Sequence, residues 1–181
     1  MSKTNSDNVI VKDAQAKPAI LFAGHGSRDV DAVREFYQLA EHFQQRFPDR
    51  IVETGFLEFV RPVIGEAVEK LKAQGVSHIQ AIPGMLMAGG HAKNDIPSEL
   101  NALQQQHNVN IEYGSELGVN AKMVQAAQDR IMEGEQVLKD QIGESYKREE
   151  TLLVVVGRGA SDADANSNIC KITRILEEGM G

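Results

Sequence analysis

AILFAGHGS, Ala19 to Ser27, is an apolar run that ends abruptly in a glycine-rich turn. An unbroken apolar run without polar alternation is typical of a strand that is buried on both faces. From Val30 onward, apolar side chains recur at helical spacing until Pro48 stops the pattern. A doubly buried strand followed by a helix is the opening of a βαβ unit, so this stretch predicts a parallel sheet.

The same alternation of strand and helix continues along the chain. Pro62 opens a second helical stretch that Gly75 closes, and Asp95 is expected to cap a third helix with Pro97 in its first turn. A long fourth helix is expected from Asn120, and a last one over residues 169–176. The sequence therefore predicts an α/β fold with an open, mostly parallel sheet, in the order 2-1-3-4 for the first unit. The remaining predicted strands are RIVETGFLEF (50–59), HIQAIPGMLM (78–87), NVNIEYG (108–114) and TLLVVVG (151–157).

Composition sets the broad class of the protein. The 181 residues carry a net charge of −7, with 41% hydrophobic and 25% charged residues, as in ordinary globular proteins. No Lys/Arg cluster suggests a nucleic-acid partner, and no apolar run reaches the roughly 18 residues of a membrane span. The single cysteine, Cys170, fits a reducing compartment, and residues 1–17 lack the apolar core of a signal peptide. We therefore expect a cytoplasmic protein with a loose N-terminal tail over residues 1–17.

The sequence contains an internal repeat. LFAGHGSRDVDAVREF, from Leu21, resembles VVVGRGASDADANSNI, from Val154, at an offset of 133 residues. The two glycines, two aspartates and the following alanine match, and so do the apolar positions of the next helix; chance similarity between two strand–helix turns is the alternative. The repeat predicts a first domain over residues 18–147. Residues 148–181 then form a linker and the opening strand and helix of a second, incomplete copy.

Three residues with metal-binding side chains follow predicted strands. His25 follows the first strand, Glu58 lies at the end of the second and His91 follows the third, with 33 residues between successive members. Carboxyl ends of parallel strands meet at one edge of a sheet, and neighbouring strands are about 4.8 Å apart. Two imidazoles and a carboxylate at one edge suit a divalent transition metal such as cobalt, nickel, iron or zinc.

Each of these signals also has a plainer interpretation. A histidine after a glycine turn is often a loop hydrogen-bonding group, and GHGS alone is also typical of an anion-binding turn at a helix N-terminus. Glu58 is then a surface charge, and Met85–Met87 belong to the core. His42, His78 and His107 receive no role. The chain lacks the Gly-x-Ser-x-Gly elbow of an esterase.

Three motifs together resemble a known family. LFAGHGSRD, FLEF with Pro62 four residues after Glu58, and PGMLMAGGHAKNDIP are similar to motifs of the sirohydrochlorin cobaltochelatases, the CbiX-type class II tetrapyrrole chelatases of cobalamin synthesis. The similarity covers about residues 19–120, and the segment from Val154 resembles the start of the second half in long, two-domain members. The resemblance implies Rossmann-like halves with the active site at the carboxyl edge of the sheet. It also implies insertion of a divalent metal, cobalt first, into sirohydrochlorin.

The resemblance also implies roles for individual residues. His25 and His91 fall where the family places histidines that bind the metal and accept protons, and Glu58 falls where related chelatases have a carboxylate near the metal. The two glycines before His91 are expected to turn the backbone out of the sheet and expose the imidazole. The metal is a substrate, and no organic cofactor is expected. The residues expected to contact the tetrapyrrole are Ser27, Arg28, Met85, Met87, Gly89, Gly90 and Lys93.

Two other functions stay open at this point. The same site suits insertion of iron or nickel into the same ring, because the affinity order of divalent metals does not fix the metal used in a cell. The incomplete second copy also favours a metal- or anion-binding half-domain without catalysis. The sequence does not choose between these alternatives.

The second copy carries Arg158 where the first carries His25. A guanidinium stays protonated and cannot bind a metal, so we expect one metal site per chain, with Arg158 facing substrate carboxylates. A lone strand and helix cannot bury both of their faces. The segment is therefore expected to pack on the first unit or on another copy of the chain, which predicts a homodimer through the C-terminal segment. The residues expected to be buried there are Leu153, Val155, Ile169 and Ile172.

Overall fold

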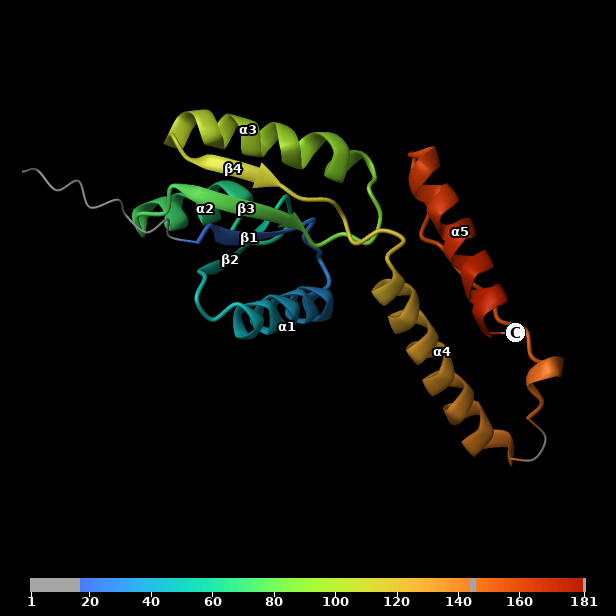
Figure 1. Ribbon diagram of the computed structural model, residues 1–181. Coiled ribbons are helices and arrows are strands. Elements are labelled where there is room, and N and C mark those ends of the chain that lie inside the picture. The colour runs from blue at the N-terminus through green and yellow to red at the C-terminus, as the bar shows by residue number, and fades with distance from the viewer. Residues whose placement is uncertain (1–16, 144–145, 181) are drawn as a thin grey trace, which may run out of the picture.

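The computed structural model describes residues 17–143 and 146–180, and its centre is a four-stranded sheet (Figure 1). All neighbouring strands are parallel and their order is β2-β1-β3-β4, so the predicted α/β class and strand order are confirmed. β1 lies in the middle with a partner on each side. The strands are β1 (Ala19–Gly24), β2 (Val52–Phe56), β3 (His78–Pro83) and β4 (Asn110–Tyr113).

Helices cover both faces of the sheet. α1 (Val30–Arg46) lies on one face, and α2 (Ile64–Ala73) and α3 (Ile96–His107) lie on the other (Figure 1). Every residue of β1 is buried, because this strand has a neighbour on each side and helices above and below it. The apolar run at Ala19–Gly24 is thus the centre of the fold.

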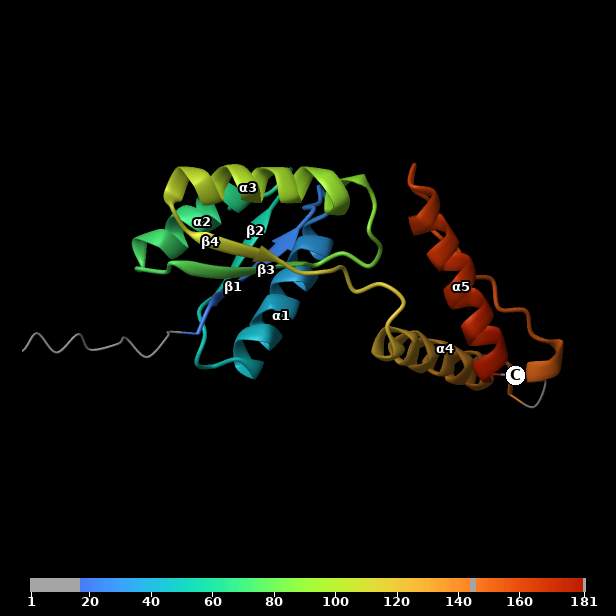
Figure 2. The ribbon, with the colours of Figure 1, turned by 45° about the horizontal axis from the view of Figure 1, so that its top comes forward.

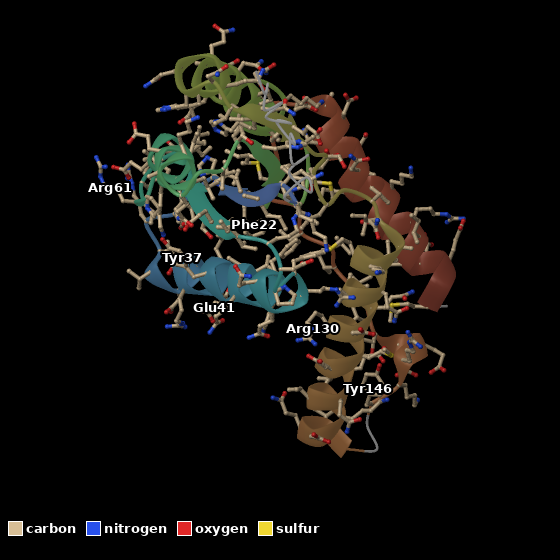
Figure 3. All side chains as sticks on the ribbon, turned by 60° about the vertical axis from the view of Figure 1, so that its left-hand side comes forward. Phe22, Tyr37, Glu41, Arg61, Arg130 and Tyr146 are labelled. Carbon is tan, nitrogen blue, oxygen red and sulfur yellow. The ribbon has the colours of Figure 1, made fainter. Side chains whose placement is uncertain are left out.

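Alternate side chains of β1 supply the two halves of the core. Phe22 projects toward α1 (Figure 3), where its ring stacks on Phe36 with centroids 4.5 Å apart. Leu21 and Ala23 point the other way and pack against α2 and α3 in one buried cluster. This alternation is the period-2 geometry of a strand, and it fixes the position of the carboxyl end of β1.

Two sequence predictions near the third strand are corrected. β3 ends at Pro83 rather than Met87, and residues 84–90 form a loop. Asp95 does not cap a helix, because helical backbone already begins at His91 in a π-helical turn, His91–Asp95, which runs directly into α3. The glycines and the proline that suggested a later start mark the loop and the turn before the regular helix.

The predicted fifth strand is also wrong. Residues 151–160 have no regular secondary structure, although α5 (Ala163–Met180) follows them as expected. α4 (Ala121–Ile142) begins with Asn120 as its N-cap, and α4 and α5 lie side by side beyond the carboxyl ends of the strands (Figures 1 and 2). A strand needs a neighbour with which to pair its backbone. No described strand lies beside residues 151–157, so the apolar run stays unpaired.

The expected burial of this C-terminal segment is only partly seen. Leu153 and Val155 are 50% and 37% exposed, whereas Ile169 and Ile172 are half-buried on α5. The C-terminal segment is therefore much less covered than the first unit. Among the described residues, no helix is both long enough and apolar enough to cross a membrane.

Candidate metal centre

The loops after β1 and β2 are joined by backbone hydrogen bonds. The Leu57 amide donates to the Gly24 carbonyl at 2.9 Å, and the Glu58 amide donates to the His25 carbonyl at 3.0 Å. These bonds continue the β1–β2 ladder beyond the ends of both strands. His25 and Glu58 are therefore placed beside each other by the backbone rather than by side-chain packing.

Gly26 allows the two loops to approach so closely. Its φ of +91° lies in the left-handed region, and a Cβ at this position would collide with the Glu58 carbonyl oxygen. Only glycine satisfies both demands without strain. The glycine of GHGS is thus needed because a second metal-binding residue crosses directly over it.

The side chain of His25 faces Glu58. His25 Nδ1 lies 3.0 Å from the Gly26 carbonyl, which only accepts, so Nδ1 carries a proton and donates it there. His25 Nε2 lies 3.2 Å from Glu58 Oε1. A carboxylate and a nitrogen lone pair repel at this distance unless a cation lies between them, and that cation is either a proton or a metal ion.

His91 is oriented by a carboxylate of its own helix. Nδ1 of His91 lies 2.6 Å from Asp95 Oδ2, one helical turn further along. The carboxylate accepts the Nδ1 proton and leaves Nε2 free to bind a metal, an arrangement that recurs around protein-bound metals. Asp95 thus orients the His91 ring, although the sequence pattern predicted it as a helix cap. The i, i+4 spacing of His91 and Asp95 predicts this pair only when the helical backbone is known to begin at His91.

The π-helical turn is anchored to the sheet. The Tyr113 hydroxyl, at the end of β4, donates to the Ala92 carbonyl at 3.0 Å. Burial raises the pKa of Tyr113 above its ordinary value, so the hydroxyl remains a donor across the neutral range. This bond fixes the start of the turn that carries His91, and nothing in the sequence pattern indicated it.

The three predicted metal-binding residues meet at one point. His25, Glu58 and His91 each offer one ligand atom, and these atoms all lie within 4.8 Å of one another. The imidazole rings of His25 and His91 meet edge to face, with centroids 4.7 Å apart. One nitrogen from each histidine and one carboxylate oxygen form a donor set that fits cobalt, iron, nickel or zinc. We call this group the metal cluster.

The metal cluster borders a cleft between the sheet and the start of the second copy. The cleft has a volume of about 490 Å³ and lies at the carboxyl edge of the sheet, where ligands bind in open α/β folds. His25 and His91 line one wall with Met85 and Met87, and Arg158 belongs to the opposite wall. The first unit thus supplies imidazole and thioether side chains, and the segment that resembles it supplies a cation.

The two glycines before His91 have a different role from the expected one. Gly90 has ordinary right-handed helical angles, φ −51° and ψ −43°, and a Cβ on Gly89 or Gly90 would meet nothing within 4 Å. Neither glycine is needed for a turn or for close packing. Because Gly89 lines the cleft, the missing side chain leaves room beside His91.

The remaining predicted substrate contacts, which are Ser27, Arg28, Gly90 and Lys93, do not line the cleft. The Ser27 hydroxyl accepts a hydrogen bond from the Asp29 amide at 3.0 Å, within the turn before α1. Arg28 lies beside the ring of Phe59. Lys93 is not free, because its ammonium pairs with Asp162 at 2.7 Å and with Asp164 at 3.1 Å. Lys93 therefore ties the π-helical turn of the first unit to the start of α5.

Fold and site together define a class: a doubly wound parallel α/β protein with two histidines and a carboxylate grouped at the carboxyl edge of its sheet. The family model of CbiX matches residues 19–134. The chain belongs to the CbiX family, as its motifs suggested.

Curated relatives of the chain are named as chelatases. It is 36% identical over 162 residues to the sirohydrochlorin cobaltochelatase of Priestia megaterium, covering 88% of this chain and 50% of that protein. It is 34% identical over 163 residues to the sirohydrochlorin ferrochelatase of Bacillus subtilis, covering 90% and 59%. The chain thus spans little more than half the length of these relatives. A shorter relative, the sirohydrochlorin cobaltochelatase of Sulfurisphaera tokodaii, is 32% identical over 114 residues and is covered to 91%, with 63% of this chain aligned.

Two solved structures are also similar to this chain. The sirohydrochlorin chelatase SirB from Bacillus subtilis subspecies spizizenii, in complex with cobalt, matches with a TM-score of 0.73 at 29% identity. That match covers 89% of this chain and 62% of the other. SirB from Bacillus subtilis with Fe3+ matches with a TM-score of 0.75 at 34% identity, covering 90% and 61%. Both structures resemble the described fold over nearly the whole of this chain.

Asp95→Asn tests the positioning of His91. An amide in place of the carboxylate weakens the acceptor of the Nδ1 proton, so we expect cobalt affinity to fall about 10- to 100-fold. Isothermal titration with cobalt measures this change. Asp140→Asn is the matched control, because Asp140 accepts a bond from Gln136 on α4 in the same i, i+4 geometry. Equal affinities for both variants would contradict the role given to Asp95.

Proposed function

We propose that this chain inserts a divalent metal, cobalt first, into sirohydrochlorin. One observation carries the proposal: His25, Glu58 and His91 offer ligand atoms within 4.8 Å of one another, and His25 and His91 line a cleft at the carboxyl edge of the sheet. The relatives named as sirohydrochlorin cobaltochelatases and the cobalt complex of a related chelatase support it.

Metal insertion exchanges protons for a metal ion. A divalent ion entering a tetrapyrrole displaces two pyrrole N–H protons, so the site has to release the ion and accept protons. The His25–Glu58 pair, 3.2 Å apart, holds one cation, either a metal ion or a proton. When the ion moves into the ring, this pair and His91 are free to take up the displaced protons. The metal cluster thus serves both halves of the exchange.

The cleft suits a flat ring with charged side arms. Met85 and Met87 give it an adaptable apolar wall, and Gly89 leaves room beside His91. The substrate carries many carboxylates, and Arg158 on the opposite wall offers a planar cation that pairs with a carboxylate. Ser27 and Arg28 follow His25 in the chain and Gly90 precedes His91, and we propose all three as further substrate contacts outside the cleft.

Lys93 is a weaker candidate for substrate binding. Its hydrogen bond to Asp162, together with that to Asp164, raises the pKa of Lys93, and the bond from Lys93 lowers the pKa of Asp162. A lowered acid pKa keeps Asp162 charged until the pH falls through that lowered value, and a raised lysine pKa keeps Lys93 charged well above neutrality. The link therefore persists across the neutral range, and a substrate carboxylate has to compete with two aspartates.

Cobalt is the first choice of metal and iron the alternative. The donor set accepts either ion, and relatives are named for both. We propose a cytoplasmic location on the strength of the single cysteine, Cys170, an exposed free thiol that fits a reducing compartment. Nickel remains a further metal to include in any assay of this site.

His25→Ala and His91→Ala test the proposed function. Each variant removes one metal ligand and one proton acceptor, so we expect the rate of cobalt insertion to fall at least about 100-fold. Absorbance spectroscopy of sirohydrochlorin with cobalt, iron or nickel measures the rate. His42→Ala on α1 is the control, and circular dichroism checks that the fold is kept. Full activity in either site variant would contradict the role given to that histidine. If the unaltered chain binds the metal but does not insert it into sirohydrochlorin, a non-catalytic metal-binding protein is favoured.

Acidification is expected to weaken cobalt binding. Protonated imidazoles cannot bind a metal, so protons compete with the ion at both histidines. A cobalt titration at about pH 8 and about pH 5 is expected to show much lower affinity at the acidic end, with one site per chain at neutral pH. The Lys93–Asp162 link stays charged over this range and does not cause the change. Constant affinity would indicate carboxylate ligands alone, and two equivalent sites would contradict the role of Arg158.

We also propose that this chain associates with a second copy through residues 152–156. Val154–Val156 correspond in the repeat to Leu21–Ala23 of β1, all of which are buried between two strands and two helical layers. Val154 is instead 67% exposed. Beside it, Leu153 and Val155 line a groove of about 670 Å³ against α4 and α5. A five-residue apolar run with free backbone groups is suited to pairing with another strand.

Val154→Lys tests this association. A charge in the middle of the apolar run is costly to bury, so we expect the variant to be monomeric under conditions where the unaltered chain is a dimer. Multi-angle light scattering at several concentrations measures the mass. Val30→Lys, an exposed apolar position at the start of α1, is the control. A monomeric unaltered chain would refute the proposal.

A further inference from the structure

Phe59 is a bulky residue in a backbone conformation that bulky residues avoid. Its φ is +67°, and it is one of two non-glycine residues with positive φ among those described. The Val60 amide donates to the Glu58 carbonyl at 2.9 Å, which closes a γ-turn with Phe59 at its centre. The γ-turn with positive φ is the rare and strained form. Such strain persists only where surrounding structure enforces it, and it occurs preferentially at functional sites.

Hydrogen bonds on both sides of the turn enforce this conformation. Before it, the amides of Leu57 and Glu58 are paired with the carbonyls of the β1 loop. After the turn, two carbonyls are held in place. The Pro62 carbonyl accepts from the Phe56 amide at 2.9 Å, and the Arg61 carbonyl accepts from the Tyr37 hydroxyl of α1 at 3.2 Å. Tyr37 and Arg61 mark α1 and the loop that leads to α2 in Figure 3. The chain therefore has no freedom to relax Phe59.

The enforced turn leaves the phenyl ring at the metal cluster. Phe59 is 51% exposed, so its strain is not explained by burial in the core. Its ring centroid lies 5.9 Å from that of His25. An exposed aromatic residue alone is ordinary. An exposed aromatic ring that is held by strained backbone beside His25 is instead explained if it contacts a ligand.

Arg28 places a charge over one face of this ring and leaves the other face for a ligand. Its guanidinium carbon lies 5.0 Å from the centre of the Phe59 ring, within the range of a cation–π contact. Arg28 and Phe59 come from the loops after β1 and β2, which the shared backbone ladder holds together. An apolar face next to a cation matches a flat ring that carries carboxylates at its edge.

We infer that Phe59 is a substrate-positioning residue: its ring packs against the tetrapyrrole, and Arg28 beside it pairs with one of the ring's carboxylates. The inference rests on the proposed function. Phe59 does not line the cleft, whose apolar wall is formed by Met85 and Met87. A tetrapyrrole surrounds its metal on all sides, so it needs apolar support on both sides of the metal cluster. Phe59 supplies that support outside the cleft, beside His25.

Phe59→Asn and Phe59→Tyr separate this role from a structural one. Asparagine accepts positive φ and removes the ring, whereas tyrosine keeps the ring. For cobalt insertion, we expect the KM for sirohydrochlorin to rise about tenfold in the asparagine variant, in line with the loss of one aromatic stacking contact. The tyrosine variant should stay within about twofold of the unaltered chain. Cobalt affinity without the tetrapyrrole should not change, and the Tm of the asparagine variant should equal or exceed that of the unaltered chain, because the strain is relieved.

The outcomes are distinguishable. An unchanged KM in the asparagine variant, in a chain that metallates sirohydrochlorin, would overturn the role of Phe59 and leave the proposed function standing. A joint fall of Tm and cobalt affinity would also overturn it, because Phe59 would then be structural. If the unaltered chain neither binds nor metallates sirohydrochlorin, the proposed function fails and the inference fails with it. A raised KM with Tm and cobalt affinity maintained supports the inference.

Discussion

The hydrogen bond from the Glu58 amide to the His25 carbonyl is the contact on which the site depends. It extends the β1–β2 ladder past both strands and makes two loops into one rigid body. Gly26 permits it, because any side chain there would collide with the Glu58 carbonyl. His25 and Glu58 are therefore placed by main-chain geometry, and their side chains remain accessible. The proposed loading and release of an ion requires this combination of fixed position and open access.

The sequence predicted the sheet well because its strands carry their own signal. β1 is an unbroken apolar run, and a strand with two neighbours and two helical layers requires that composition. The run at residues 152–156 has the same composition and is not a strand, because pairing depends on a partner that composition does not reveal. The local pattern thus predicted which segments are able to form strands. Only those segments that have a neighbouring strand formed one.

The candidate site shows the same division. His25, Glu58 and His91 were predicted because each follows a strand, and parallel strands bring their carboxyl ends to one edge. Asp95 and Phe59 were not predicted as site residues, since the roles that we propose for them depend on a π-helical turn and a γ-turn. Neither turn has a hydrophobic period or a residue signature, and each is stabilised by hydrogen bonds to distant parts of the chain. Residues that act through irregular backbone are the ones that pattern reasoning is least able to find.

The repeat explains why the two walls of the cleft differ in charge. The Val33 amide donates to the Asp29 carbonyl at 3.2 Å, and the matching Asn166 amide donates to the Asp162 carbonyl at 3.2 Å. Gly26 and the matching Gly159 both have positive φ, so the two turns are built alike, which argues against chance similarity. Arg158, at the position equivalent to His25, puts a permanent cation where the first copy has a metal-binding imidazole. A second metal there would be repelled, whereas an anionic side arm of a substrate would be attracted. The residue at this one matched position therefore gives the cleft an imidazole on one side and a guanidinium on the other. The two substrates that we propose, a metal ion and a polycarboxylate ring, differ in charge in the same way, so each is suited to a different side of the cleft.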